Sequence, residues 1–153
     1  MILILLKIVL YNMAIVDIKT LEDSSSIRIP IFASNISAGF PSPADDYIED
    51  AIDLNKHLVE HPSATFFVRV KGSSMEGAGI NDGDVLIVDR SLKAKSKSII
   101  VAIVDGELTV KRLKQSAKKV FLVPENSNYS EVEITSDRFE IWGVVTYIIH
   151  KAK

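Results

Sequence analysis

From about residue 62 onward, the chain repeats one pattern: short runs of β-branched and aromatic residues alternate with residues that favour turns. Such runs are typical of β-strands, because branched and aromatic side chains pack well on a pleated surface. The pair Asp105-Gly106 separates two of the runs and favours a tight hairpin. The runs occupy residues 66–70, 85–88, 99–104, 108–113, 120–123 and 139–149. We therefore predict a mostly β fold, with a compact, mostly antiparallel β domain over residues 62–153.

The residues before this domain have a different character. Residues 17–37 are polar and irregular and include a run of three serines, and we interpret residues 1–38 as a flexible N-terminal arm. Residues 38–43 contain a glycine and two prolines, which exclude a helix and leave an extended or turning chain. Between residues 46 and 59, apolar residues recur among acids at partly helical spacing. We expect a short amphipathic helix there, within a linker over residues 39–61.

Residues 1–10 are almost wholly apolar, which raises the question of a membrane anchor or a signal peptide. Lys7 interrupts the run, and a membrane-spanning helix needs roughly 20 apolar residues. A signal peptide would also need a basic leading region and a small-residue cleavage site. Two interpretations stay open: a buried strand or helix, or a misassigned extension before a true start at Met13. We expect a cytoplasmic protein with no membrane role.

Composition limits the chemistry that this chain can perform. The sequence has no cysteine, which excludes disulfides, thiolate zinc sites and a cysteine nucleophile, so covalent chemistry must use serine, threonine or lysine. The three histidines are too scattered for a metal site, and no cofactor is indicated. A formal net charge of -2 gives no general attraction to phosphate backbones. Little direct DNA binding is therefore expected.

Two segments carry residues suited to covalent catalysis. Ser73 and Ser74 lie in a glycine-bounded loop directly after a predicted strand, although serines in such loops usually satisfy a turn or cap a helix. Residues 80–84 follow, and we interpret them as a turn because they lack the later acidic ligand of a calcium loop. Lys111 lies among apolar neighbours in the strand after the hairpin, on the opposite face from Arg112. Alternation alone leaves open which of these two faces solvent.

In their order along the chain, these pieces resemble the UmuD/LexA family of self-cleaving serine peptidases. The matching segments are residues 38–44 as the cleavage segment, 72–75 as the nucleophile loop, 82–84 with the following strand, and 105–113 as the lysine strand, with 53–55 and 61–65 similar to UmuD in particular. The resemblance implies a fold of the LexA/UmuD C-terminal type. It also implies that Ser74 is the nucleophile, that Lys111 is the general base, and that the chain is cut between Ala38 and Gly39.

The chemistry of these residues agrees with the implied roles. A serine hydroxyl is a poor nucleophile until an adjacent base accepts its proton, and serine-lysine pairs are a known form of this arrangement. The lysine must be neutral, and burial lowers its pKa from the reference value near 10.4. Ala38 and Gly39 are small enough for an extended chain to lie in a shallow cleft, and intramolecular delivery supplies a high effective concentration. Backbone N–H groups of the loop around Ser74 would hold the developing oxyanion.

The length of the arm indicates which branch of the family the chain resembles. LexA-like repressors carry a helix-turn-helix domain before the cleavage site, whereas the 38 residues before Gly39 are fewer than the roughly 50 of a small independent domain. The resemblance is therefore to the UmuD-like branch of the SOS response. It implies cleavage stimulated by a RecA filament on single-stranded DNA, a homodimer of the trimmed chain, and joint action with an error-prone UmuC-type DNA polymerase in translesion synthesis.

Two alternative functions remain at the level of sequence. A type I signal peptidase also uses a Ser-Met loop and a downstream lysine, but it offers no reason for the segment at residues 38–41. A catalytically silent module that only docks on a polymerase is the second alternative. Substitution of Ser74 distinguishes this module from a peptidase, because a pure binding module would lose nothing.

Overall fold

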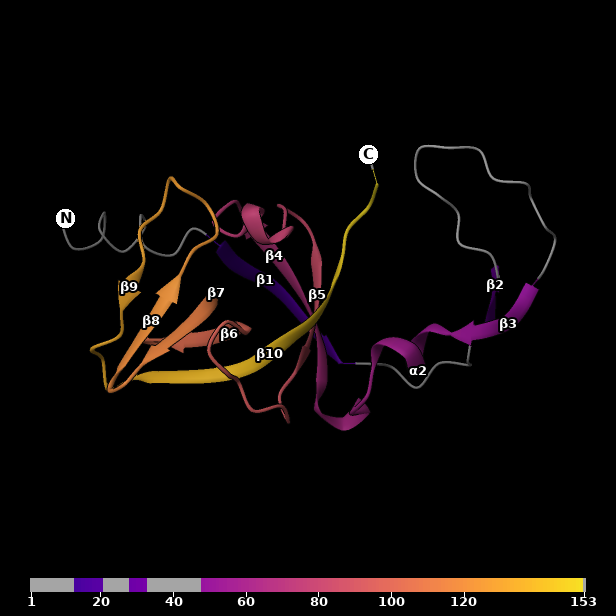
Figure 1. Ribbon diagram of the computed structural model, residues 1–153, viewed down its shortest axis with the longest axis horizontal. Helices are drawn as coiled ribbons and strands as arrows, with labels where there is room; N and C mark the ends of the chain where they lie inside the picture. The colour runs from indigo at the N-terminus through magenta and orange to yellow at the C-terminus, as the bar shows by residue number, and fades with distance from the viewer. Residues whose placement is uncertain (1–12, 21–27, 33–47, 153) are drawn as a thin grey trace. The chain divides into compact units, whose positions relative to one another are not determined.

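The computed structural model describes residues 13–20, 28–32 and 48–152. The chain divides into two units, one formed by residues 22–60 and the other by residues 1–21 together with 61–153. Figure 1 shows the elements in chain order. Within the described residues, no helix is both long and apolar enough to cross a membrane.

The smaller unit contains a two-stranded antiparallel sheet and a short helix. Strand β2 (Arg28–Phe32) pairs with β3 (Ile48–Asp53), and helix α2 (Leu54–Leu58) follows at once. Asp53 caps the helix, since its carboxylate accepts a hydrogen bond of 3.0 Å from the N–H group of Asn55. The amphipathic helix expected between residues 46 and 59 is therefore wrong in its first half. Pairing with β2 makes that half a strand, and this partner cannot be seen in the local pattern.

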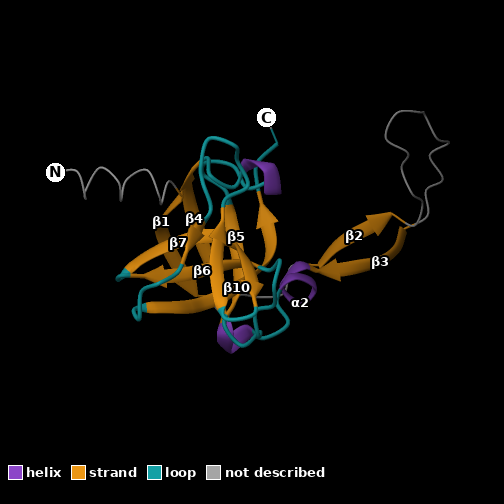
Figure 2. Cartoon of the chain, turned by 60° about the vertical axis from the view of Figure 1, so that its left-hand side comes forward, coloured by secondary structure: helices purple, strands orange, loops and turns teal. Residues whose placement is uncertain are grey.

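The larger unit is a sheet in which every neighbouring pair of strands is antiparallel. It contains β1 (Met13–Thr20), β4 (Thr65–Gly72), β5 (Val85–Asp89), β6 (Ile99–Val104), β7 (Glu107–Ser116), β8 (Lys119–Val123), β9 (Val132–Glu133) and β10 (Phe139–Ile149). The order across the sheet is β1-β4-β5-β10-β6-β7-β8-β9, and β1 also pairs with β7. Six strands thus close on themselves around one core (Figure 2), while β8 and β9 extend from β7. The predicted mostly β, antiparallel fold is confirmed.

The six predicted runs all form strands, and the turn between β6 and β7 shows why the sequence was informative. Asp105 and Gly106 have φ angles of 53° and 87°, the left-handed conformation that a two-residue hairpin of this kind requires. Val104 and Glu107 pair directly across that turn. Two short 3-10 helices, η1 (Pro62–Ala64) and η2 (Glu76–Ala78), lie on either side of β4 in the sequence.

The expectation of an irregular chain over residues 17–37 needs correction at two places. Met13–Thr20 form β1 of the main sheet, and Arg28–Phe32 form β2. Residues 21–27 and 33–37 lie outside the described part of the chain. The first strand was not recognisable from composition, because polar residues such as Asp17 and Lys19 occupy its solvent side. Met13 and Ile15 contact the core on the other side. Local composition therefore suggested a loop where pairing with β4 stabilises a strand.

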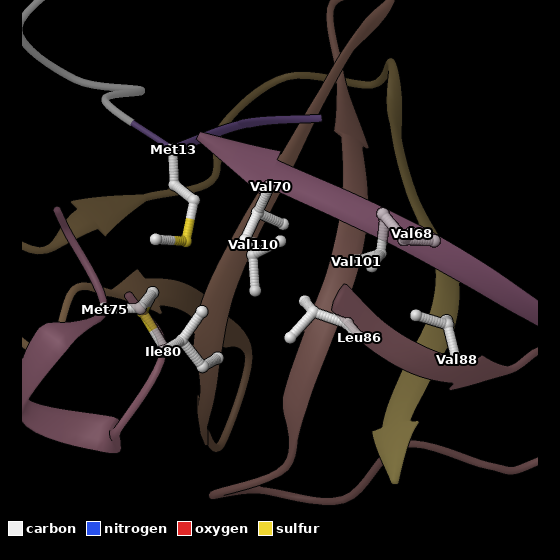
Figure 3. Packing of buried hydrophobic residues seen from close by; sticks show 9 residues of the cluster. All are labelled: Met13, Val68, Val70, Met75, Ile80, Leu86, Val88, Val101 and Val110. Atoms are coloured by element: carbon white, nitrogen blue, oxygen red, sulfur yellow. The ribbon is translucent and has the colours of Figure 1, made fainter. Parts of the chain in front are cut away.

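The core inside the closed sheet draws on strands that are far apart in the sequence, from β1 to β7. Figure 3 shows Met13 of β1 directed into the same cluster as Val70 of β4 and Val110 of β7. The cluster comprises Met13, Val68, Val70, Met75, Ile80, Leu86, Val88, Val101 and Val110, all fully buried. A second buried cluster consists of Ile100, Ala102, Val104, Leu113 and Leu122. Each fully buried Val, Leu, Ile or Met side chain contributes about 1.5–3 kcal/mol to folding. The core therefore keeps the strands that carry the site residues in fixed positions.

Candidate functional site

The loop that carries Ser74 leaves β4 through a sharp turn at Gly72. Gly72 has a φ of 115°, a conformation that other residues rarely adopt. Its N–H group donates a hydrogen bond of 2.7 Å to the Asp82 carboxylate. Met75, the residue after Ser74, is fully buried and points into the core (Figure 3). The loop is therefore held on both sides of Ser74, whose side chain is itself fully buried.

The turn before β5 supports the nucleophile loop. The N–H group of Gly83 donates to the carbonyl of Val70 at 3.0 Å, and the N–H group of Val70 donates to the carbonyl of Asp84 at 3.0 Å. The Asp84 carboxylate accepts a bond of 2.7 Å from the N–H group of Asn81. The two carboxylates of this turn thus both accept backbone N–H groups: Asp84 binds within the turn, and Asp82 binds Gly72 at the start of the loop that carries Ser74.

Lys111 lies on β7 with its ammonium group inside the protein, and 2% of the residue is exposed. Its Nζ lies 2.9 Å from Ser74 Oγ, although the two residues are 37 positions apart in the sequence. It also lies 3.2 Å from Thr109 Oγ1 and 2.9 Å from the carbonyl oxygen of Val110. Arg112 faces the other way and forms an ion pair with Glu125. Strand alternation placed Lys111 and Arg112 on opposite faces, and the fold buries the lysine face.

Burial lowers the pKa of Lys111 from 10.5 to about 8. A substantial fraction of the amine is therefore neutral in mildly alkaline solution. A neutral amine has two N–H donors and one lone pair. If the donors point to Thr109 Oγ1 and to the Val110 carbonyl, the lone pair points to Ser74 Oγ. In that arrangement the neutral amine can accept the proton of Ser74.

A second loop, beyond β8, holds the nucleophile loop from its outer side. The N–H group of Glu125 donates to the carbonyl of Ser74 at 2.8 Å, and the Glu125 carbonyl accepts from the N–H group of Gly77 at 2.6 Å. Asn126 Nδ2 donates to the carbonyl of Ser73 at 2.9 Å. We call Glu125 and Asn126 the clamp. A side chain at position 77 would have its Cβ 2.6 Å from the Glu125 carbonyl oxygen, so only glycine fits beneath the clamp.

The clamp also directs the free backbone donors of the nucleophile loop. Because it holds the carbonyl oxygens of Ser73 and Ser74, the planar peptide groups turn the next N–H groups the opposite way. Within the described residues, the N–H groups of Ser73, Ser74 and Met75 donate no hydrogen bond to the protein. They are therefore available to a developing negative charge near Ser74 Oγ. An open groove of about 710 Å³, lined by the clamp, Glu76 and Tyr129 among others, lies beside this loop.

The structure brings together two of the four predicted site residues. Ser74 and Lys111 are in contact, whereas Ala38 and Gly39 belong to residues 33–47, outside the described part of the chain. Sequence reasoning missed Thr109 and the clamp. Thr109 lies two positions before Lys111 in a strand, so alternation places it on the same face and could have identified it. The clamp residues carried no comparable signal, because their contacts are between segments about 50 positions apart.

Known proteins resemble this chain over most of its length. A family model described as Peptidase S24-like matches residues 30–146. Protein MucA of Salmonella typhimurium is 48% identical over 135 residues, which cover 86% of this chain and 92% of that protein. Protein ImpA of Shigella flexneri is 43% identical over 131 residues, covering 86% and 89% respectively. LexA repressor 1 of Pseudomonas syringae pv. tomato is 37% identical over 122 residues, which cover 72% of this chain and 60% of the repressor.

Proposed function

Because this chain belongs to the Peptidase S24-like family, we propose that it is a serine peptidase that cuts its own chain, with Ser74 as nucleophile and Lys111 as general base. The family resemblance expected from the motifs is confirmed, and it favours this activity over a type I signal peptidase. The observation that carries the proposal is the buried contact of 2.9 Å between Lys111 Nζ and Ser74 Oγ. The depressed lysine pKa supports it.

The bond to be cut is the peptide between Ala38 and Gly39. Neutral Lys111 accepts the proton of Ser74 while Oγ attacks the carbonyl carbon of Ala38. Backbone N–H groups of the nucleophile loop stabilise the oxyanion, and its collapse breaks the C–N bond. The Lys111 ammonium then donates its proton to the amine of Gly39, which leaves as a new N-terminus. Water, activated by Lys111, hydrolyses the acyl-serine ester and restores both side chains.

We further propose that this cleavage serves damage tolerance in the cytoplasm. On the family resemblance, a RecA filament on single-stranded DNA stimulates the cut. The trimmed chain forms a homodimer and acts with an error-prone UmuC-type polymerase in translesion synthesis. Incubation of the purified protein with RecA, single-stranded DNA and a nucleotide, followed by mass spectrometry, tests this. One new N-terminus at Gly39 is expected, and a cut elsewhere contradicts the assignment.

Two substitutions test the dyad directly. We expect Ser74→Ala and Lys111→Ala each to abolish cleavage, because removal of either member of a catalytic unit costs most of its rate. Ser73→Ala is the matched control: its hydroxyl contacts Tyr129 at 3.0 Å rather than the lysine, so substantial cleavage should remain. Circular dichroism confirms that each variant folds. Cleavage at the parental rate in Lys111→Ala would rule out the lysine as the base.

A further inference from the structure

Strand β1 is the element that closes the main sheet. It pairs with β4 from Met13 opposite Gly72 to Thr20 opposite Phe66. On its other side, Ala14 pairs with Thr109 of β7, the residue whose hydroxyl contacts the Lys111 amine. Without β1, the facing edges of β4 and β7 would have no strand between them. The strand therefore completes the sheet directly beside the catalytic lysine.

Side-chain burial adds to the backbone ladder of β1. Met13 is fully buried, and Ile15 packs against the same core cluster. The pairing register shifts between Ile15 and Asp17, so Val16 has no partner and is 57% exposed. Such a bulge changes which residues face inward after it. Ile18 pairs with buried Val68 but is itself 36% exposed, so the burial of β1 is concentrated at Met13 and Ile15.

Strand β1 lies before the predicted cut in the sequence, although the strands that it contacts lie after the cut. Met13–Thr20 precede Ala38-Gly39, so a cut there removes the covalent link between β1 and the strands that it contacts. We propose that β1 of the N-terminal fragment stays seated between β4 and β7 after cleavage. Cutting and fragment release are then two separate steps, and release uncovers the edges of β4 and β7. The location of the cut rests on the proposed function, whereas the seating of β1 does not.

The test introduces the cut independently of the catalytic dyad. In a Ser74→Ala chain, a recognition site for a sequence-specific protease replaces residues 36–41, and that protease makes the break. Size-exclusion chromatography under native conditions, at about micromolar protein, is followed by a denaturing gel of each fraction. We expect both fragments in one peak. Backbone amides of β4 should also keep their protection from hydrogen exchange after the cut. Elution of the fragments in separate peaks would overturn the proposal.

A matched pair of substitutions identifies the contact that retains the fragment. Ile15→Asp places a charge against the core, so the β4 amides should lose their protection from hydrogen exchange after the cut, even if pairing of β2 with β3 keeps the two fragments together. Val16→Asp places the same charge in solvent and should leave that protection unchanged. Equal behaviour of the two variants would contradict seating through the core. If Ile15→Asp does not fold, the comparison of β4 amide protection between cut and uncut Ser74→Ala chains tests the seating of β1 by itself. Failure of the unmodified protein to cut itself would count against the proposed function only.

Discussion

At the scale of single residues, the site depends on one lysine whose amine is buried. Lys111 is buried beside Ser74 and Thr109, and within the described part of the chain no carboxylate contacts its amine. Burial without an opposite charge favours the neutral form, which is the form that a general base needs. The same burial opposes folding, because the unfolded chain keeps its lysine protonated in water. Activity and stability should therefore both depend on pH through this residue.

Self-cleavage in the absence of a filament should follow the titration of Lys111. The rate should rise through pH 8, because the neutral fraction of an amine with a pKa of about 8 increases there, and it should level off above that pH. The first-order rate constant, measured from gels of samples held between pH 6 and 10.5, checks this. Ser73→Ala should show the same midpoint. A rate that does not change over this range would exclude Lys111 as the base.

Replacement of Lys111 by methionine should change how stability depends on pH. The folded-state pKa is lowered, so the cost of burying the amine is fully present below pH 8 and disappears as pH rises towards 10.5. Lowering the pKa from 10.5 to about 8 corresponds to about 3 kcal/mol. In a Ser74→Ala background, the free energy of unfolding of the lysine form should rise relative to Lys111→Met by up to this amount between pH 7.5 and 10.5. Urea unfolding at both pH values measures it, and a constant difference would contradict burial as the cause.

At the scale of elements, two loops from distant parts of the sequence form the site together. The loop after β4 carries Ser74, and the clamp beyond β8 holds this loop by hydrogen bonds to its carbonyl groups. Side chains of the β7 strand face both ways, so Lys111 meets the first loop while Arg112 pairs with Glu125 of the clamp. The clamp therefore acts on the orientation of the nucleophile loop and makes no contact with the amine itself.

Asn126→Asp tests the role of the clamp with almost no change in shape. Aspartate can keep the bond that Asn126 Oδ1 accepts from the N–H group of Asn128, but it replaces the donor to the Ser73 carbonyl with an acceptor. We expect a plateau rate of self-cleavage that is about 5- to 150-fold lower, since leaving the partly buried Ser73 carbonyl without its donor costs about 1–3 kcal/mol. The pH midpoint should stay near 8. Asn128→Asp adds the same charge nearby and is the control; an equal loss in both variants would attribute the effect to charge.

At the scale of the whole molecule, the arm has two parts with different properties. Strand β1 belongs to the main sheet, whereas the predicted cut lies farther along the chain, between β2 and β3 in sequence. Activation by cleavage would therefore act on a chain whose first strand is already part of the fold. Trimming and loss of β1 are distinct events in this arrangement.

A chain that begins at Gly39 should support polymerase-dependent mutagenesis without DNA damage. It lacks β1 and β2 and begins at the second residue of the cleavage segment, so it represents the product after the fragment has left. Mutation frequency in undamaged cells, with and without the UmuC-type polymerase, provides the measurement, and the Ser74→Ala full-length chain serves as the inactive control. If the trimmed chain failed to bind the polymerase while the uncut chain bound it and copied past lesions, activation by trimming would be wrong.

Much of the fold was determined by the sequence itself, because strand periodicity and turn chemistry are local properties. The runs of residues 66–149 and the Asp105-Gly106 hairpin required no knowledge of their neighbours. The motifs also identified Ser74 and Lys111, which the structure places in contact. Strand alternation could also have identified Thr109, because it lies two positions before Lys111 on the same face. These features were accessible because each depends on residues that are close together along the chain.

Tertiary structure alone decided the features that depend on partners distant in sequence. Residues 13–20 and 48–53 form strands because β4 and β2 satisfy their backbone groups, although their composition suggested an arm and a helix. The buried face of β7 is the face covered by the nucleophile loop, and this burial sets the pKa of Lys111. The clamp reaches Ser73 across 53 positions. The sequence by itself indicated Ser74 and Lys111 as the proposed site residues. Packing between distant segments determined the burial of Lys111 and the contact between the two side chains, because burial and hydrogen bonding are properties of the folded chain.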